Sequence, residues 1–185
     1  ASASAPIGLY RIHPDRDPPT GALVAVAPPE RLARWLSARG YLPEGVPLLK
    51  HVAALPGQRV CRDGAAVAVD DNTLAQAQPL DRFGRDLPVW QGCHFVAKTE
   101  LFLLNPSHPD SLDGRYFGAL PADAVIGRAA ILRHDFPDRA IADAAYASPA
   151  TPVSEAHLMA EGLSPSFVQY MRNWKGFVEE ASSAA

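Results

Sequence analysis

Proline is unusually frequent in this chain, at 18 of 185 residues. A proline removes a backbone hydrogen-bond donor and breaks the interior of a helix. So many prolines favour short strands and turns over a helical bundle. Because 48% of the residues are hydrophobic, the chain can still bury a substantial core, which argues against disorder throughout.

Short apolar runs bounded by turn residues predict a mainly β fold. The expected strands lie in residues 7–12 and 22–26, two or three within 46–70, a strand pair in 93–104, and a last strand in 125–132. Residues 72–92 and 105–118 have the composition of polar, turn-rich loops.

One short helix is predicted over about residues 29–39. Leu32, Trp35 and Leu36 recur at helical spacing, and Gly40 is a typical residue just beyond a helix C-terminus. The composition changes after residue 135. We expect a first domain over 1–135, an Ala/Pro-rich linker over 136–153 and an amphipathic helical tail over 154–185. The tail fits either a helix docked on the domain or a partner-binding helix.

Charge argues against one class of partner, and hydropathy against one kind of segment. The net charge is -3 and no cluster of basic residues stands out, which argues against nucleic-acid binding. No run of about 18 apolar residues occurs, so the sequence contains no membrane-spanning helix.

The two cysteines, Cys61 and Cys93, lie 32 residues apart. This is not the Cys-x-x-Cys spacing of redox catalysis, and no further ligand-spaced Cys/His set suggests zinc. A disulfide and two separate buried thiols both remain open on the residues alone. We expect no metal and no cofactor.

Lysine usage is the most informative chemical signal. Of the 17 basic residues, 14 are arginine and only Lys50, Lys98 and Lys175 are lysine. Arginine cannot lose its proton at accessible pH, whereas a buried lysine can, because burial lowers its pKa by up to about 3–5 units. Lys50 lies in the apolar stretch 47–55, which suits a general base for a serine hydroxyl. The alternative is a strand lysine whose head points outward into water.

Ser4 lies in a small, polar segment that Pro6 stiffens. Such a serine is either held in a fixed, exposed position or belongs to a frayed N-terminal tail. The residues of this segment alone favour the tail.

Three sequence boxes taken together favour the first interpretation. Residues 4–10, SAPIGLY, resemble the Ser-x-Pro-x-Gly-x-Tyr box around the nucleophile of TraF-type conjugal-transfer signal peptidases, a branch of the type I signal peptidase superfamily. Residues 48–57, LLKHVAALPG, resemble the box that carries the base, and residues 111–118, SLDGRYFG, resemble the third box. Residues 126–129, IGRA, match the closing strand, and the boxes follow in the family order.

The resemblance assigns roles residue by residue. Ser4 matches the nucleophile and Lys50 the base of a Ser-Lys dyad. Ser111 matches the serine that orients the lysine amine, and Ser2 matches a residue whose hydroxyl helps to form the oxyanion hole.

Asp113 and Arg115 match a supporting ion pair. Two positions depart from the family pattern. His51 replaces the usual arginine, and Gly114 replaces a serine, which we expect to loosen the third box. A Ser-His pairing is disfavoured, because neighbouring strand residues point to opposite faces and Lys50 and His51 should not both face Ser4.

The resemblance implies a signal-peptidase-like antiparallel β core and a membrane-associated serine endopeptidase. Such an enzyme would process, by cleavage or cyclisation, a pilin precursor or related exported protein in conjugative transfer. It would be the soluble part of a protein on the periplasmic face of the bacterial inner membrane, held by an N-terminal anchor that this sequence lacks. An oxidising periplasm would favour the Cys61–Cys93 disulfide.

Two alternatives use the same residues differently. One is a catalytically silent periplasmic protein that binds or scaffolds components of the transfer apparatus. The lesser one is a fragment of a LexA-like self-cleaving repressor, which shares the Ser-Lys dyad and a related β core.

Overall fold

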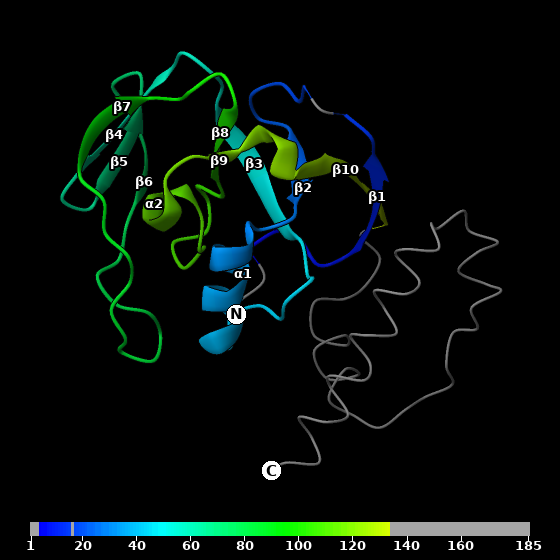
Figure 1. The fold of residues 1–185 in the computed structure, drawn as a ribbon, viewed down its shortest axis with the longest axis horizontal. Coiled ribbons are helices and arrows are strands. Elements are labelled where there is room, and N and C mark those ends of the chain that lie inside the picture. The colour runs from blue at the N-terminus through cyan, green and yellow to red at the C-terminus, as the bar shows by residue number, and fades with distance from the viewer. Residues whose placement is uncertain (1–3, 16, 134–185) are drawn as a thin grey trace, which may run out of the picture. The chain divides into compact units, whose positions relative to one another are not determined.

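The structure, a computed structural model, describes residues 4–15 and 17–133. Within them every strand pairing is antiparallel, and the strands form two sheets with the orders β1-β10-β2-β3-β8-β9 and β6-β5-β4-β7 (Figure 1). The predicted mainly β, antiparallel fold class is confirmed. The predicted linker 136–153 and helical tail 154–185 lie outside the described residues.

The strands are short, as the proline content predicts. Their bounds are β1 Leu9–His13, β2 Leu23–Val26, β3 Leu48–Ala54, β4 Arg59–Asp63, β5 Ala66–Val69, β6 Asn72–Gln76, β7 Gly92–Phe95, β8 Glu100–Leu104, β9 Leu120–Pro121 and β10 Val125–Arg133. The helices are α1 Glu30–Ala38, α2 Gly114–Phe117 and the 3₁₀ turn η1 Ala122–Ala124.

Helix α1 is the one that its apolar spacing predicts. It buries Leu36 against the six-stranded sheet and ends at Ala38, two residues before Gly40, whose φ of +66° is the left-handed geometry that glycine adopts easily. The Gly40 N–H donates to the carbonyl of Ser37 and the Tyr41 N–H to that of Leu36, which closes a Schellman-type C-cap.

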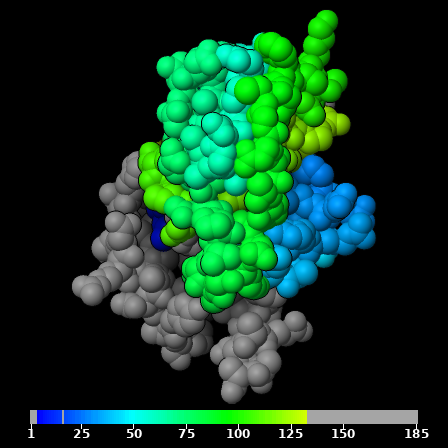
Figure 2. Space-filling view, turned by 90° about the vertical axis from the view of Figure 1, so that its left-hand side faces the viewer, coloured from blue at the N-terminus to red at the C-terminus, as the bar shows by residue number. Residues whose placement is uncertain are grey.

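Strand β8 is the element that the two halves of the core share. It is buried on both faces: Leu101 and Leu103 join the cluster under α1, while Phe102 and Leu104 join the cluster under the four-stranded sheet. Figure 2 views the molecule from the side of that second sheet. β8 pairs with β3, so the strand that carries Lys50 lies beside the best-buried strand of the fold.

Three local predictions were wrong. Residues 72–92 contain a strand, β6, because pairing with β5 outweighs the polar composition of Asn72–Gln76. The two strands of 93–104 do not pair with each other, since β7 joins β4 while β8 joins β3 and β9. Residues 105–118 are not a plain loop, because α2 forms within them.

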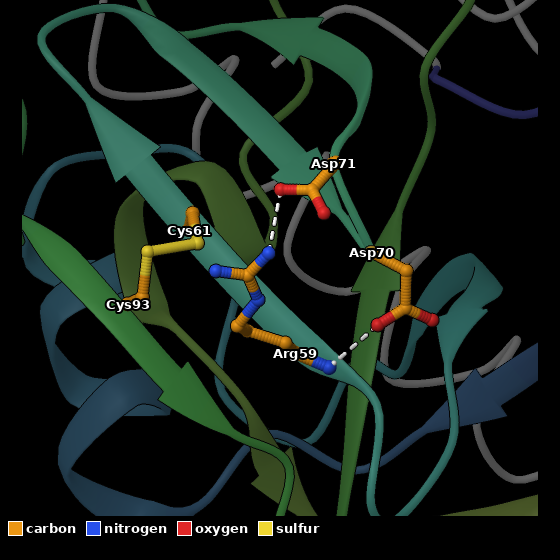
Figure 3. The surroundings of a disulfide bond; sticks show 5 residues. All are labelled: Arg59, Cys61, Asp70, Asp71 and Cys93. Carbon is orange, nitrogen blue, oxygen red and sulfur yellow. Dashed lines mark hydrogen bonds and ion pairs between the residues drawn. A yellow bond between two sulfur atoms is a disulfide. The ribbon is translucent and has the colours of Figure 1, made fainter.

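A disulfide joins Cys61 on β4 to Cys93 on β7. The two residues lie directly opposite each other in the strand register, as Figure 3 shows. Near the bond, the Arg59 guanidinium contacts Asp71 at 2.5 Å, and the Arg59 backbone N–H donates to the carboxylate of Asp70 at 2.9 Å. These contacts fix β4 to the turn between β5 and β6.

The disulfide yields a stability prediction. It closes a loop of 32 residues, so the double variant Cys61→Ala, Cys93→Ala should lose about 2–4 kcal/mol of unfolding free energy through the less restricted unfolded chain. Chemical denaturation followed by circular dichroism measures this difference. Reductant should lower the unfolding free energy of the wild type to that of the variant and leave the unfolding free energy of the variant unchanged. A wild type that is no more stable than the variant would contradict the prediction.

Candidate active site

Lys50 is the third of the seven residues of β3, on the face that the alternation of the strand turns inward. The residue is only 4% exposed, so the outward-pointing alternative does not hold. Its Nζ lies 2.9 Å from the Oγ of Ser4 and 2.9 Å from the Oγ of Ser111. The structure therefore brings together three residues from three separate sequence boxes.

The surroundings of Lys50 change its acidity. Burial lowers its pKa to about 8, an effect that the negative charge of Asp113 opposes and the positive charge of Arg115 reinforces. A substantial fraction of the amine is therefore neutral near pH 8. A neutral amine can accept the proton of Ser4 and donate one of its own to Ser111.

Asp113 and Arg115 form a buried ion pair, with 2.8 Å between Nη2 and Oδ2. The Asp113 carboxylate accepts the backbone N–H groups of Arg115 and Asn105, so it caps α2 and holds the end of β8. The Arg115 guanidinium donates to the carbonyls of Asn105 and His108 at 2.9 and 2.8 Å. The pair shapes the turn that presents Ser111, which agrees with a scaffolding role.

Gly114 fits this arrangement more tightly than the sequence comparison with the family predicts. A Cβ atom there would lie 2.7 Å from the ring of Phe102 and 2.8 Å from the carbonyl oxygen of Leu103. Both distances are shorter than real Cβ contacts allow. The expectation that glycine loosens the third box was wrong, because glycine is what lets α2 pack against β8.

Ser4 is half-buried and is held by more than the lysine. The side-chain amide of Asn105 donates to the Ser4 carbonyl at 2.7 Å and lies 3.1 Å from the Ser4 Oγ. The hydroxyl of Tyr10 donates to the carbonyl of Pro6 at 2.5 Å, and burial raises the pKa of Tyr10. The segment around Ser4 is therefore fixed in this structure, unlike a frayed tail. Ser2 lies outside the described residues, so its oxyanion role stays a prediction.

Sequence reasoning missed Asn105. Its position can be found only from the strand register: β8 pairs Leu104 with His51, so the next residue of the chain arrives beside Lys50. The signal in the sequence is weak, since it consists of one amide between the apolar β8 and Pro106.

A pocket of about 340 Å³ opens beside Ser4. Its apolar wall comes from β1, β2 and β10, through Tyr10, Leu23, Ala129 and Ile131. His51 also lines it, but of these two neighbouring residues it is Lys50 whose side chain contacts Ser4 Oγ. The link between His51 and Ser4 is indirect, because the Nδ1 of His51 lies 3.0 Å from Asn105 Oδ1 and Asn105 in turn contacts Ser4.

The residues that the structure describes contain no helix that is long and apolar enough to cross a membrane.

Sequence comparisons with known proteins agree with the resemblance that the boxes show. The chain is 36% identical over 134 residues to a probable conjugal transfer protein TraF of Sinorhizobium fredii, covering 68% of this chain and 71% of that relative. It is 35% identical over 138 residues to the conjugal transfer protein TraF of Agrobacterium fabrum, covering 68% and 76%. A crystal structure of a signal peptidase I from Enterococcus faecalis aligns with a TM-score of 0.37 and 21% identity, over 60% of this chain and 96% of that one.

The family described as signal peptidase, peptidase S26, matches residues 1–133, which include every box described above. The chain belongs to the signal peptidase family, peptidase S26.

Proposed function

We propose that this chain is a serine endopeptidase in which Ser4 is the nucleophile and Lys50 the general base. The observation that carries the proposal is the 2.9 Å contact between Lys50 Nζ and Ser4 Oγ, at a buried position where the lysine pKa falls to about 8. An ordinary surface lysine stays protonated near pH 8 and cannot accept the serine proton.

The reaction would proceed in two steps. In acylation, Ser4 Oγ bonds to the scissile carbonyl carbon while its proton moves to the neutral Lys50 amine. The ammonium then gives that proton to the leaving amine as the peptide C–N bond breaks, which leaves an ester on Ser4. In deacylation, Lys50 takes a proton from the incoming nucleophile as that nucleophile bonds to the acyl carbon, and the ammonium returns the proton to Ser4 Oγ as the ester C–O bond breaks. Water as the nucleophile gives cleavage, and an amine gives a new peptide bond.

Ser111 would orient the base. A lysine amine on a four-carbon stem can rotate, and one fixed hydrogen-bond partner limits that rotation. Ser111 is 2% exposed, and its hydroxyl lies 2.9 Å from Nζ on the interior side of the site. The lone pair of the neutral amine can then be directed at Ser4.

The substrate that we propose is an exported protein of a conjugative transfer system, such as a pilin precursor. Two of the relatives are named conjugal transfer proteins, and the family is that of signal peptidases. Catalysis would then take place at the periplasmic face of the inner membrane. The competing hypothesis, a catalytically silent scaffold, requires a Ser4 that does not react.

Replacement of the proposed base separates these hypotheses. Lys50→Arg keeps the positive charge but removes the ability to give up a proton, so acylation of Ser4 should slow by about 10²–10⁴-fold. The rate is measured by mass spectrometry of the Ser4 adduct of a penem-type acylating probe. Lys98→Arg, the same change at an exposed turn, is the matched control and should react like the wild type.

Because arginine is larger than lysine, thermal unfolding must show that the Lys50→Arg variant is folded. If it is not, Lys50→Met offers a similar length without charge. Wild-type acylation in a folded Lys50 variant would refute the dyad. A wild-type protein that never labels at Ser4 would favour the scaffold.

The pKa of Lys50 predicts a pH profile. Folding lowers this pKa from 10.5 to about 8, and the active form is the neutral one. The acylation rate should therefore be constant well above pH 8 and fall about tenfold per pH unit below it. Rates measured from pH 6 to 10, with folding checked at each pH, test this. A profile that is flat across that range would contradict lysine as the base.

Ser111→Ala tests the orientation of the base. Loss of this partner should slow acylation by about 10–100-fold, because the amine is no longer fixed toward Ser4. Ser37→Ala on α1 makes the same change outside the site and should leave the rate unaltered. An unaltered rate in Ser111→Ala would mean that Lys50 needs no such support.

A further inference from the structure

The side chain of Asn105 is a buried junction between three parts of the site. It lies one residue beyond β8, is 1% exposed, and has a partner for each of its polar atoms. The Asp113–Arg115 pair fixes its backbone, since the carboxylate accepts the Asn105 N–H and the guanidinium donates to the Asn105 carbonyl. The backbone of Asn105 is therefore fixed independently of the contact that its side chain makes with Ser4.

The amide of Asn105 has one possible orientation. Its Oδ1 faces the backbone N–H of His51 at 3.2 Å, a group that can only donate. Its Nδ2 faces the carbonyl oxygens of Ser4 and Leu49 at 2.7 and 3.0 Å, groups that can only accept. A flipped amide would place oxygen against oxygen and NH₂ against N–H, so the backbone fixes which end faces the nucleophile.

This orientation determines the direction of the hydrogen bonds at Ser4. The Asn105 Nδ2, which can only donate, lies 3.1 Å from Ser4 Oγ, so the serine oxygen accepts there. The two hydrogens of Asn105 Nδ2 have three acceptors: the Ser4 carbonyl, Ser4 Oγ and the Leu49 carbonyl. One of the two hydrogens is therefore shared between two acceptors. With a lone pair occupied by Asn105, the Ser4 hydroxyl hydrogen is free to point at Lys50 Nζ, as proton transfer requires.

The same orientation determines the tautomer of His51. Asn105 Oδ1 carries no hydrogen and lies 3.0 Å from His51 Nδ1, so the proton of this hydrogen bond resides on Nδ1. His51 thus adds a second donor to the amide oxygen, beside its own backbone N–H. The imidazole therefore helps to hold the Asn105 amide in its orientation.

From this geometry we infer that Asn105 is the positioning residue of the nucleophile, which directs the Ser4 hydroxyl at Lys50, and that His51 holds its amide in place. The inference rests on the proposed function, because it concerns how Ser4 reacts. It gives a role to the histidine that departs from the family's usual arginine.

The test uses the isosteric variant Asn105→Asp. The carboxylate still accepts from His51, but it cannot donate to Ser4, and it faces two carbonyl oxygens instead. We expect the plateau rate of Ser4 acylation at high pH to fall by about 10–100-fold. Asn105 and Lys50 contact the same oxygen and so lie within about 6 Å of each other, a range at which a new negative charge raises a lysine pKa by about 1–3 units. The midpoint of the pH profile should therefore rise too.

Asn72→Asp is the matched control, because it makes the same change on the exposed strand β6 and should leave both plateau and midpoint unaltered. Rates are expressed per folded protein, with unfolding temperatures measured for each variant. A folded Asn105→Asp protein with the wild-type plateau rate overturns the inference. A wild type that does not label at Ser4 overturns the proposed function instead, so the two failures are distinguishable.

A second pair of variants changes His51, the hydrogen-bond partner of Asn105, and leaves the Asn105 amide intact. These variants keep the inference testable if Asn105→Asp does not fold. His51→Ala removes the Nδ1 donor and should slow acylation by about 3–10-fold. His51→Asn can place an amide N–H near the position of Nδ1 and should recover most of that loss. A His51→Ala protein with the wild-type rate overturns the role of His51, and equal losses in both variants overturn it as well.

Discussion

The Asp113–Arg115 ion pair is the interaction on which the candidate site depends. Both side chains are almost fully buried, and removing two charges from water is expensive unless further hydrogen bonds accompany them. Here the carboxylate accepts two backbone N–H groups, and the guanidinium donates to the carbonyls of Asn105 and His108. The pair thereby reinforces a turn that its own backbone already closes, since the His108 N–H donates to the Asn105 carbonyl and the Ser111 N–H to the His108 carbonyl. Ser111 and Asn105, the two residues that flank the dyad, both belong to that turn.

Burial, more than the charges of this pair, determines the pKa of Lys50. An isolated ammonium on β3 would either bind water or lose its proton altogether. The charges of Asp113 and Arg115 act on Lys50 in opposite directions, so burial remains the largest influence on its pKa. The result is a value near 8, where both protonation states are accessible. A general base needs this property, because it must accept a proton and later release it.

The sequence predicts those parts of the fold that local patterns determine. Lys50 stands out because it interrupts an apolar strand, and α1 is found from the spacing of Leu32, Trp35 and Leu36. Pairing between distant segments determines the rest. β6 is polar and becomes a strand only against β5, and α2 is four residues long and needs the Asp113 cap. Asn105 and His51 reach the site through the register of β3 and β8, and no local pattern shows this register.

The arrangement also explains how one site can satisfy two opposite requirements. The base must be shielded from water to lower its pKa, whereas the nucleophile must meet a substrate. Lys50 Nζ lies between two hydroxyls: Ser111 is buried, and Ser4 lines the pocket. Ser4 precedes the edge strand β1, so the strand ladder does not hold it. The contacts from Asn105 and Lys50 do so instead, and they leave its outer side open to the pocket. The sheet therefore fixes the base, and side-chain hydrogen bonds fix the nucleophile.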